Sequence, residues 1–500
     1  MKNPLMPLQI LGLALILALS PPVGADTGEQ DEVSITFDGS MDDWPAGLEA
    51  TADAHWIYFR YDARQLVSLQ NGPVMTVLQI DLDENEKTGM ASDNGALGID
   101  LEITMTTLDQ RDPTRLGGGV EINTFSPGGQ HESLTHAKIG LSYLPTYASK
   151  SFEIRIARAI DGPDWIRAMA RSTDAIRYQF INRDEQYMTK WSSGVRTLSL
   201  PPIAPGRELF DVSIPSKADD SIRIVSWNVL WGTPSKEPDG FARVLRTLDP
   251  DVILFQEWDH GYWTGDDRIP KRDYIDWLNT HLDQGKWSIR LGAERGVLVA
   301  SRFQLDPFLP EKIGIAANRS AGIKRSRVVR CASARVETPL GEVGAVSIHL
   351  KSRGGLDSTE DRIRVAEITA VHDAIAEALS EQKPDFLVVS GDWNLVGGHT
   401  PVDRAVVGLD LEGSDLLVVE PRRLGAGDAI SWRDQRSHFA PGRLDYALVA
   451  DDGVEVAQTF ILDTTLLTDA TLRQSGLERT DTDGSDHLPV VIDLHRTGQD

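Results

Sequence analysis

The chain has 500 residues, which exceeds the usual size of a single hydrophobic core, so at least two domains are expected. Its formal charge of -25 repels polyanions at long range, so the net charge does not favour nucleic acid as a partner. The single cysteine, Cys331, excludes an intramolecular disulfide, and stability must therefore come from ordinary hydrophobic cores.

Residues 1–25 carry the pattern of a secretory signal. Lys2 precedes an apolar run from Leu8 to Leu19, and Val23-Gly24-Ala25 suits cleavage before Asp26. The run is shorter than the roughly 20 apolar residues that span a bilayer, and no other segment is long enough. We therefore expect a secreted or periplasmic protein without stable membrane insertion, and we expect it to be a monomer.

Residues 30–200 have the pattern of an all-β sandwich. Apolar and polar residues alternate in several segments, as in half-buried strands, and these segments are 54–61, 77–82, 98–103 and 151–157. Several such strands in succession, separated by turn residues, are typical of a β-sandwich.

The start of this region carries a short aromatic motif. Phe37-Asp-Gly-Ser-Met-Asp-Asp-Trp44, followed by Trp56-Ile-Tyr-Phe, resembles the start of family 9-type carbohydrate-binding modules. The resemblance implies a carbohydrate surface as a partner, with Trp44 or Trp56 stacking on a sugar ring. The alternative, which residue burial statistics favour, is that both tryptophans close the core of the sandwich.

An acidic loop at 81–89 follows the second of these strands. Asp81, Asp83 and Asn85 have the alternating oxygen-ligand spacing of calcium loops. Glu86, however, stands where an EF-hand needs glycine, and Ser92 stands where it needs a glutamate. A structural Ca²⁺ site and a solvated acidic hairpin turn therefore both remain open.

A composition break separates the two halves of the chain. Pro201-Pro202, Pro205-Gly206 and the polar stretch 216–220 predict a linker over 201–220, with a second domain over 221–496.

Four predicted strands of the second half end in polar side chains. The strands are 222–228, 251–257, 343–349 and 386–389, and the side chains at or just after their ends are Asn228, Glu257, His349, Asp392 and Asn394. Further strands are predicted at 296–302 and 328–336, and helices at 240–248 and 358–378. Because rigid strands hold the loops that follow them in place, α/β enzymes commonly keep their chemistry at such strand ends.

Two later segments have the opposite polarity. Asp445 begins the predicted strand 446–450, and Asp486-His487 precede the strand 488–494. These side chains can reach the same edge only if their strands run the other way. The sheets must then be mixed or antiparallel, not doubly wound.

Six short motifs in the second half resemble the endonuclease/exonuclease/phosphatase superfamily in their order. They are Ser226-Trp-Asn-Val229, Gln256-Glu257, His349-Leu-Lys-Ser352, Gly391-Asp-Trp-Asn394, Arg443-Leu-Asp-Tyr446 and Ser485-Asp-His-Leu-Pro489. The resemblance implies an α/β fold, a four-layered α/β/β/α sandwich with mixed sheets. It also implies a hydrolase of phosphoester bonds.

Phosphoester hydrolysis requires a hard cation, an activated water and donors for the developing charge. Glu257 is the oxygen ligand expected for Mg²⁺, with Mn²⁺ as an alternative. The resemblance places Asn228 and Asp486 in or beside the same metal shell. It makes Asp392 the acceptor of the water proton and lets Asn394 hold a phosphate oxygen.

The two histidines complete the implied site. His487, oriented by Asp445, and His349 would donate to the phosphate as negative charge develops. The residue types leave two candidates for the general base, Asp392 and the Asp445–His487 pair, of which we favour Asp392. Glu294 is a candidate to orient His349.

Basic residues indicate the substrate class. Lys351 and Arg353 lie in a stretch, 349–355, that resembles secreted bacterial nucleases of the superfamily. A cluster that includes Arg325 could line a phosphate-tracking groove or could balance neighbouring acids; its members are Lys324, Arg325, Arg327 and Arg330. Aromatic residues after Glu257 could stack on a base, touch lipid or pack, and they are Trp258, Tyr262 and Trp263.

The leading hypothesis is a secreted Mg²⁺-dependent phosphodiesterase acting on nucleic acid. The first alternative is a phosphatase or phospholipase C-like enzyme acting on small or lipid phosphates. The second is a surface-binding protein with an idle catalytic domain, which the retention of every expected acid, amide and histidine disfavours.

Overall fold

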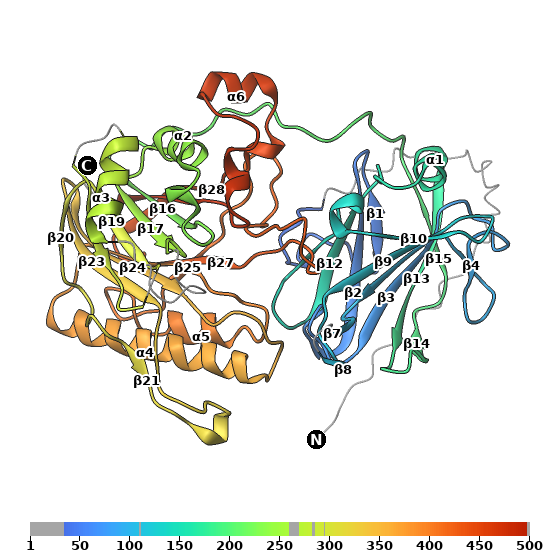
Figure 1. Ribbon diagram of the computed structural model, residues 1–500, viewed down its shortest axis with the longest axis horizontal. Coiled ribbons are helices and arrows are strands. Elements are labelled where there is room, and N and C mark those ends of the chain that lie inside the picture. Colours follow the sequence, from blue (N-terminus) through green and yellow to red (C-terminus); the bar gives the residue numbers. More distant parts are fainter. Residues whose placement is uncertain (1–34, 110–111, 260–269, 283–285, 295, 498–500) are drawn as a thin grey trace, which may run out of the picture. The chain divides into compact units, whose positions relative to one another are not determined.

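The computed structural model describes residues 35–497, except 110–111, 260–269, 283–285 and 295 (Figure 1). The secretory signal predicted at 1–25 lies outside these residues. Within the described part of the chain, no helix is long and apolar enough to cross a bilayer.

Two antiparallel sheets form the first β-rich part. One has the order β1-β2-β12-β11, with β1 Ala50–Ala52, β2 Trp56–Val67, β12 Ser149–Ala157 and β11 Ser142–Leu144. The other has the order β10-β9-β6-β3-β13-β14, with β15 also paired to β13. Its strands are β10 His131–Leu134, β9 Val120–Phe125, β6 Leu101–Met105, β3 Met75–Asp81, β13 Ala175–Arg183, β14 Thr189–Ser192 and β15 Arg196–Ser199.

Alternate side chains of these strands fill one shared core. Phe59 of β2, Ile154 of β12 and Leu78 of β3 are fully buried in the same apolar cluster. Short elements surround it: β4 Met90–Ala91, β5 Gly98–Ile99, β7 Leu108–Asp109, β8 Asp112–Leu116, η1 His136–Ile139 and α1 Asp164–Ser172. The predicted all-β region is therefore present, because period-2 alternation places every second residue in one interior.

Neither tryptophan of the aromatic motif stands free for a sugar ring. Trp44 is buried, and its indole Nε1 donates to Glu153 Oε1 at 2.8 Å. Trp56 is half-buried; its Nε1 donates to Glu208 Oε2 at 2.7 Å, and the Arg155 guanidinium lies 4.2 Å from its ring centroid. Packing inside the protein is confirmed for Trp44, which lies in a small buried cluster beside the main sandwich core, and Trp56 packs against that cluster while half-buried. Carbohydrate binding by this region stays a prediction.

The second part contains two six-stranded sheets. The first, here the β16 sheet, has the order β18-β19-β17-β16-β29-β28, with β18 Ser288–Leu291, β19 Leu298–Ser301, β17 Val252–Gln256, β16 Ser221–Asn228, β29 Val490–Arg496 and β28 Val454–Ile461. The second, here the β25 sheet, has the order β20-β23-β24-β25-β27-β26, with β20 Gln304–Asp306, β23 Cys331–Thr338, β24 Gly341–His349, β25 Phe386–Asp392, β27 Asp445–Val449 and β26 Leu417–Val419.

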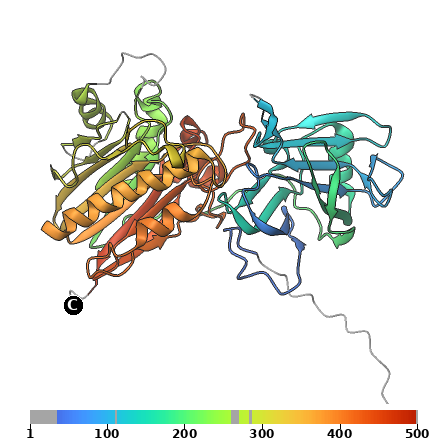
Figure 2. The ribbon, with the colours of Figure 1, turned by 90° about the horizontal axis from the view of Figure 1, so that it is seen from below.

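These sheets face each other between two layers of helices (Figures 1 and 2). Ile224 and Leu254 of the β16 sheet meet Ala345 and Val388 of the β25 sheet in one buried cluster. The outer face of the β16 sheet packs on α2 Pro238–Leu248 and α3 Lys271–His281. The outer face of the β25 sheet packs on α4 Thr359–Glu381 and α5 Thr400–Val406, and α4 is the long orange helix of Figure 2. The four-layered α/β/β/α sandwich is thus confirmed.

Smaller elements complete this part: η2 Thr233–Ser235, β21 Gly314–Ile315, η3 Arg319–Ala321, β22 Arg327–Val328, η4 Thr464–Leu466, α6 Asp469–Ser475 and η5 Asp481–Gly484. The apolar side of α4 packs into the core, since Ile368, Val371 and Ile375 are buried against the β25 sheet. The Ser358 side chain caps α4 by accepting a hydrogen bond from the Asp361 amide at 3.1 Å.

Strand directions agree with the expected mixture. β16 and β17 are parallel, as are β24 and β25, whereas β29 is antiparallel to β16 and β27 is antiparallel to β25. The carboxyl ends of the parallel strands therefore meet the amino ends of β27 and β29 at one edge, as the polarity argument required.

The segment predicted as a linker makes contacts along its length. The Ala204 amide donates to Ala54 O at 2.9 Å, and the Phe210 amide donates to Leu466 O at 2.8 Å. An ion pair of 2.9 Å also joins Arg155 of β12 to Asp428 in the loop between β26 and β27. The proposed domain boundaries stay predictions, but residues 201–220 are not a free tether.

Candidate active site

The site begins with two parallel strands whose register places His349 directly beside Asp392. The preceding residue, Gly391, has φ 151°, and a Cβ there would lie 2.0 Å from Ile348 O. Only glycine therefore allows β25 to approach β24 this closely. The spacing between the two functional side chains is consequently set by main-chain pairing.

Asp392 is the most heavily hydrogen-bonded acid of the site. Its Oδ1 accepts from the Asn394 amide at 2.9 Å, and its Oδ2 accepts from Asn394 Nδ2 at 2.8 Å and from Asn228 Nδ2 at 3.1 Å. The side chain is 2% exposed. Asn394, which the resemblance expected to touch phosphate, thus holds the carboxylate in position, and its backbone is left-handed with φ 49°.

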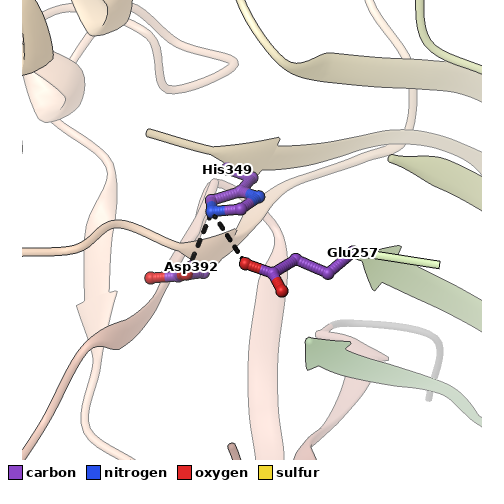
Figure 3. Close-up of side chains that lie close together, drawn as sticks. All are labelled: Glu257, His349 and Asp392. Atoms are coloured by element: carbon purple, nitrogen blue, oxygen red, sulfur yellow. Dashed lines mark ion pairs between the residues drawn. The ribbon is translucent and has the colours of Figure 1, made fainter. Parts of the chain in front are cut away.

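Glu257 joins Asp392 through His349 (Figure 3). The His349 Nε2 lies 3.5 Å from Glu257 Oε1 and 3.4 Å from Asp392 Oδ2. Glu257 directly follows β17 and has φ 58°, so the chain turns there and aims its carboxylate across the sheet edge. Its Oε2 is buried without a hydrogen-bond partner.

A second pair lies on the other side of Asp392. His487 Nδ1 lies 2.8 Å from Asp445 Oδ2, and His487 Nε2 lies 3.7 Å from Asp392 Oδ2. The Ser431 hydroxyl donates to Asp445 Oδ2 at 2.7 Å and accepts from the amides of Leu444 and Asp445 at 3.0 Å. Asp445 therefore orients the imidazole, as predicted, and Ser431 orients Asp445.

Burial and charge separate the protonation states of these groups. Burial raises the pKa of Asp392 to about 7, against the effect of the His487 charge. Burial and the nearby charge of Arg330 hold the pKa of His349 well below its ordinary value. Burial would lower the pKa of His487, but the carboxylates of Asp445 and Asp392 raise it well above its ordinary value. Near neutral pH the site thus holds a protonated His487, a neutral His349 and a carboxyl poised to exchange a proton.

The donor set fits a hard divalent cation. Burial raises the pKa of Glu257, and the negative charge of Asp486 adds to that rise. The two carboxylates therefore repel each other electrostatically. Asp486 Oδ2 accepts from Trp432 Nε1 at 2.9 Å, while its Oδ1 is buried without a partner. Unpaired buried carboxylate oxygens are what an oxygen-ligated metal requires. Asn228 Nδ2 donates to Asp392 Oδ2 at 3.1 Å, and Asn228 Oδ1 accepts a hydrogen bond from the Leu230 amide at 3.1 Å.

The basic residues fall into a half-buried and an exposed group. The electrostatic influence of the half-buried Arg330 reaches Glu257, Asp392 and His349. Arg325 and Lys324 are exposed between η3 and β22. The charge of Arg330 therefore influences the catalytic acids, and its guanidinium donates to Leu350 O. The described contacts do not join Arg325 to these acids.

A buried arginine holds the other predicted substrate loop. Arg364 of α4 is fully buried and donates to the carbonyls of Lys351, Arg353 and Gly354 at 2.9, 2.5 and 2.9 Å. The Lys351 ammonium donates to Ser352 O at 2.7 Å, and Arg353 is exposed with φ 68°. The loop is therefore built to a fixed shape from inside the protein.

Several contributors were not predicted. Ser431 and Trp432 lie in an irregular loop that gives no periodic signal, and Arg330 was only one member of a basic cluster. Trp258, offered as a stacking residue, is fully buried against Phe255, Tyr274 and Trp277. Tyr262 and Trp263 lie outside the described residues. Among the described contacts, no hydrogen bond or ion pair joins Glu294 to His349.

Comparison with known proteins agrees with this arrangement. The Endonuclease/Exonuclease/phosphatase family matches residues 225–487, which is more than half of the chain. The chain therefore belongs to the Endonuclease/Exonuclease/phosphatase family. Members of this family hydrolyse phosphoester bonds with a divalent metal.

The solved structures that match this chain are distant from it in sequence. The human nocturnin catalytic domain with bound sulfate is 18% identical, covering 56% of this chain and 96% of that one, with a TM-score of 0.35. Truncated Caenorhabditis elegans TDP2 is 15% identical (55% and 97% covered, TM-score 0.33), and sphingomyelinase C from Streptomyces griseocarneus is 13% identical (55% and 99% covered, TM-score 0.35). The comparison with curated proteins found no match. None of these similarities carries an argument about substrate.

Proposed function

We propose that this phosphoesterase is a secreted, Mg²⁺-dependent phosphodiesterase that cleaves nucleic acid. The observation that carries the proposal is the presence, in one site, of the buried Asp392 and of buried carboxylate oxygens without a hydrogen bond on Glu257 and Asp486. A proton acceptor beside an open set of metal ligands is the minimum that metal-assisted hydrolysis needs.

The cation would be held by Glu257, with Asp486 and Asn228 beside it. When bound, Mg²⁺, or Mn²⁺ as the alternative, would neutralise charge on the phosphoryl oxygens. The two carboxylates lie on loops after β17 and before β29, two strands that flank β16 on opposite sides.

The protein's own groups divide the proton transfers. Asp392 accepts the proton of the attacking water, because its pKa of about 7 balances availability and basicity near neutral pH. Protonated His487, held through Nδ1 by Asp445, directs Nε2 toward the site and donates to the charge that develops on phosphate. Neutral His349 adds a second donor through Nε2, which faces two carboxylates and therefore carries the hydrogen.

Nucleic acid is favoured by local charge despite the acidic whole. The charge of Arg330 influences Asp392 and Glu257, Arg327 lies 3.7 Å from Glu367, and Lys324 and Arg325 continue the basic run to the surface. A polyanion can follow such a run, since each phosphate contact releases counterions. Lys351 and Arg353, in the loop held by Arg364, are the further candidate contacts.

The test is degradation of plasmid DNA by the purified mature protein with Mg²⁺, beside an EDTA control. Asp392→Ala is the inactive variant, and Asp276→Ala, which changes an exposed acid of α3, is the matched control. Cleavage that needs Mg²⁺ and disappears only in Asp392→Ala would establish the proposal. If the folded wild type leaves DNA and RNA intact but hydrolyses phosphomonoesters, inositol phosphates or phospholipids, the nuclease assignment is wrong and the phosphoesterase class stands.

Secretion is tested separately. The chain is expressed with its own amino terminus in a bacterial host, and the amino terminus of the exported protein is sequenced. A mature chain that begins at Asp26 in the periplasm or medium supports the proposal. An unprocessed chain in the cytoplasm contradicts it.

A further inference from the structure

A second carboxylate cluster lies in the β-sandwich, away from the catalytic residues in sequence. Asp81 is the last residue of β3, Asp83 follows in the turn, and Asp100 stands between β5 and β6. One carboxylate oxygen from each can be chosen so that all three lie within 4.8 Å of one another. Asp81 and Asp100 are completely buried, whereas Asp83 is exposed.

Each buried acid uses one oxygen to shape the turn and leaves the other without a partner. Asp100 Oδ2 accepts from the Leu82 amide at 2.8 Å, and Asp81 Oδ1 accepts from the Asn85 amide at 3.2 Å. Asp100 Oδ1 and Asp81 Oδ2 are buried without a hydrogen bond. Buried oxygens of like charge are costly unless something positive lies between them.

One positive side chain approaches the cluster but does not neutralise it. Arg177 Nη1 lies 3.6 Å from Asp81 Oδ2, beyond hydrogen-bond distance. Burial raises the pKa of Asp100 to about 7. When all three carboxyls are ionised, their charges and that of the one guanidinium leave a net charge of two negatives. A divalent cation would balance that charge and give the buried carboxylates a positive partner.

We infer that Asp81, Asp83 and Asp100 bind a Ca²⁺ ion that ties the 81–89 loop to the start of β6. All three donors are carboxylates, the ligand type that calcium prefers. Two oxygens on one Ca²⁺ can be as far apart as about 5 Å, because each lies about 2.4 Å from the ion, whereas the smaller Mg²⁺ requires about 4 Å. The upper limit of 4.8 Å on the oxygen separations in this cluster lies within the range that one Ca²⁺ ion can span.

The ligand set differs from the one that the loop spacing predicted. The Asn85 side chain accepts a hydrogen bond from the Lys87 amide at 3.2 Å, so it closes a turn. Asp100, which is remote in sequence, takes the third position. Gly89 has φ 67°, and a Cβ there would lie 2.3 Å from Ile99 O and 2.9 Å from Asp100 Oδ1, so glycine allows the turn to pass close to the backbone at Ile99 and to Asp100.

The inference is tested by thermal unfolding of the full mature chain. Chelator-treated protein is titrated with CaCl₂ at a fixed excess of MgCl₂, which occupies the catalytic site and leaves calcium-specific binding as the variable. Wild type is compared with Asp100→Asn, Asp83→Asn and the control Asp161→Asn, which changes an exposed acid of the same sandwich. Calorimetric titration with CaCl₂ gives the stoichiometry.

We expect calcium at one hundred times its dissociation constant to raise the Tm of wild type and Asp161→Asn by about 5 °C or more. Asp100→Asn should lose that rise and one equivalent of bound Ca²⁺. Without calcium it should unfold no earlier than wild type, because the variant removes one of the repelling charges. Should Asp100→Asn not fold, the exposed Asp83→Asn decides, with Ca²⁺ affinity lowered about tenfold or more.

A wild-type Tm that does not change with calcium concentration overturns the inference. Asp100→Asn and Asp83→Asn variants whose Tm rises with calcium as much as that of wild type also overturn it. A Tm rise that MgCl₂ alone produces in full, with no further effect of calcium, also overturns it.

Discussion

Replacing Asp392 with asparagine should abolish activity and should make the protein more stable, relative to wild type, above neutral pH than below it. The native pKa of about 7 lies about three units above the ordinary aspartate value, which corresponds to about 4 kcal/mol. A folded-state pKa that is raised stabilises the fold fully below the unfolded pKa and loses that contribution as the pH rises through 7. Wild type should therefore lose about 4 kcal/mol relative to Asp392→Asn between pH 4 and pH 8.

The assay is urea unfolding of both proteins from pH 4 to pH 8 in the presence of a chelator, because a bound cation would stabilise the ionised carboxylate. Taking the difference between the two proteins cancels the titrating groups that Asp392 does not influence. His487 does not cancel, because the Asp392 carboxylate raises its pKa. Asparagine keeps the volume but offers one acceptor to the three donors around Asp392, which adds a constant offset of about 1–3 kcal/mol.

The control is Asp276→Asn, whose stability should stay parallel to that of wild type at every pH. A difference between wild type and Asp392→Asn that does not change over this range would refute the claim that burial sets the state of this carboxyl. Restoring Mg²⁺ at pH 8 should then stabilise wild type more than Asp392→Asn.

Three further variants test other parts of the structure. Arg325→Glu should lower kcat/KM on DNA about tenfold and flatten its salt dependence. It should leave hydrolysis of bis(4-nitrophenyl) phosphate unchanged, with Arg473→Glu as the control; equal loss on both substrates contradicts a role in tracking. Ser431→Ala should cost about 2 kcal/mol or more in urea unfolding, since two buried backbone N–H groups lose their acceptor, and a change below about 0.5 kcal/mol would be inconsistent with this. Trp44→Ala should lower the free energy of unfolding by about 3 kcal/mol or more in the same assay, because the indole is buried. An unchanged free energy of unfolding would contradict the burial of this side chain.

The sequence predicted the catalytic residues that stand at the ends of regular strands. Asn228, Glu257, His349 and Asp392 follow apolar runs, and the opposite polarity of the run after Asp445 required a mixed sheet. Strand ends can be located from a period of two, so the side chains there can be assigned to one sheet edge.

Residues that act through irregular backbone could not be found in this way. Ser431 and Trp432 support Asp445 and Asp486 from a loop, where no period exists to indicate direction. Arg364 interrupts an apolar helix pattern and is expected in solvent, yet its buried guanidinium organises three carbonyls. Asp100 enters its cluster only through the pairing of β3 with β6, which a local spacing rule cannot reveal.

The close approach at Gly391 bears on how such an enzyme can change its substrate. His349 and Asp392 are locked by strand pairing, so no loop insertion can alter the distance between them. The surfaces that carry Arg325 and Arg353, by contrast, lie on connecting segments that tolerate replacement. Substitutions in these connecting segments can therefore change the substrate specificity, whereas the geometry of His349 and Asp392 is retained.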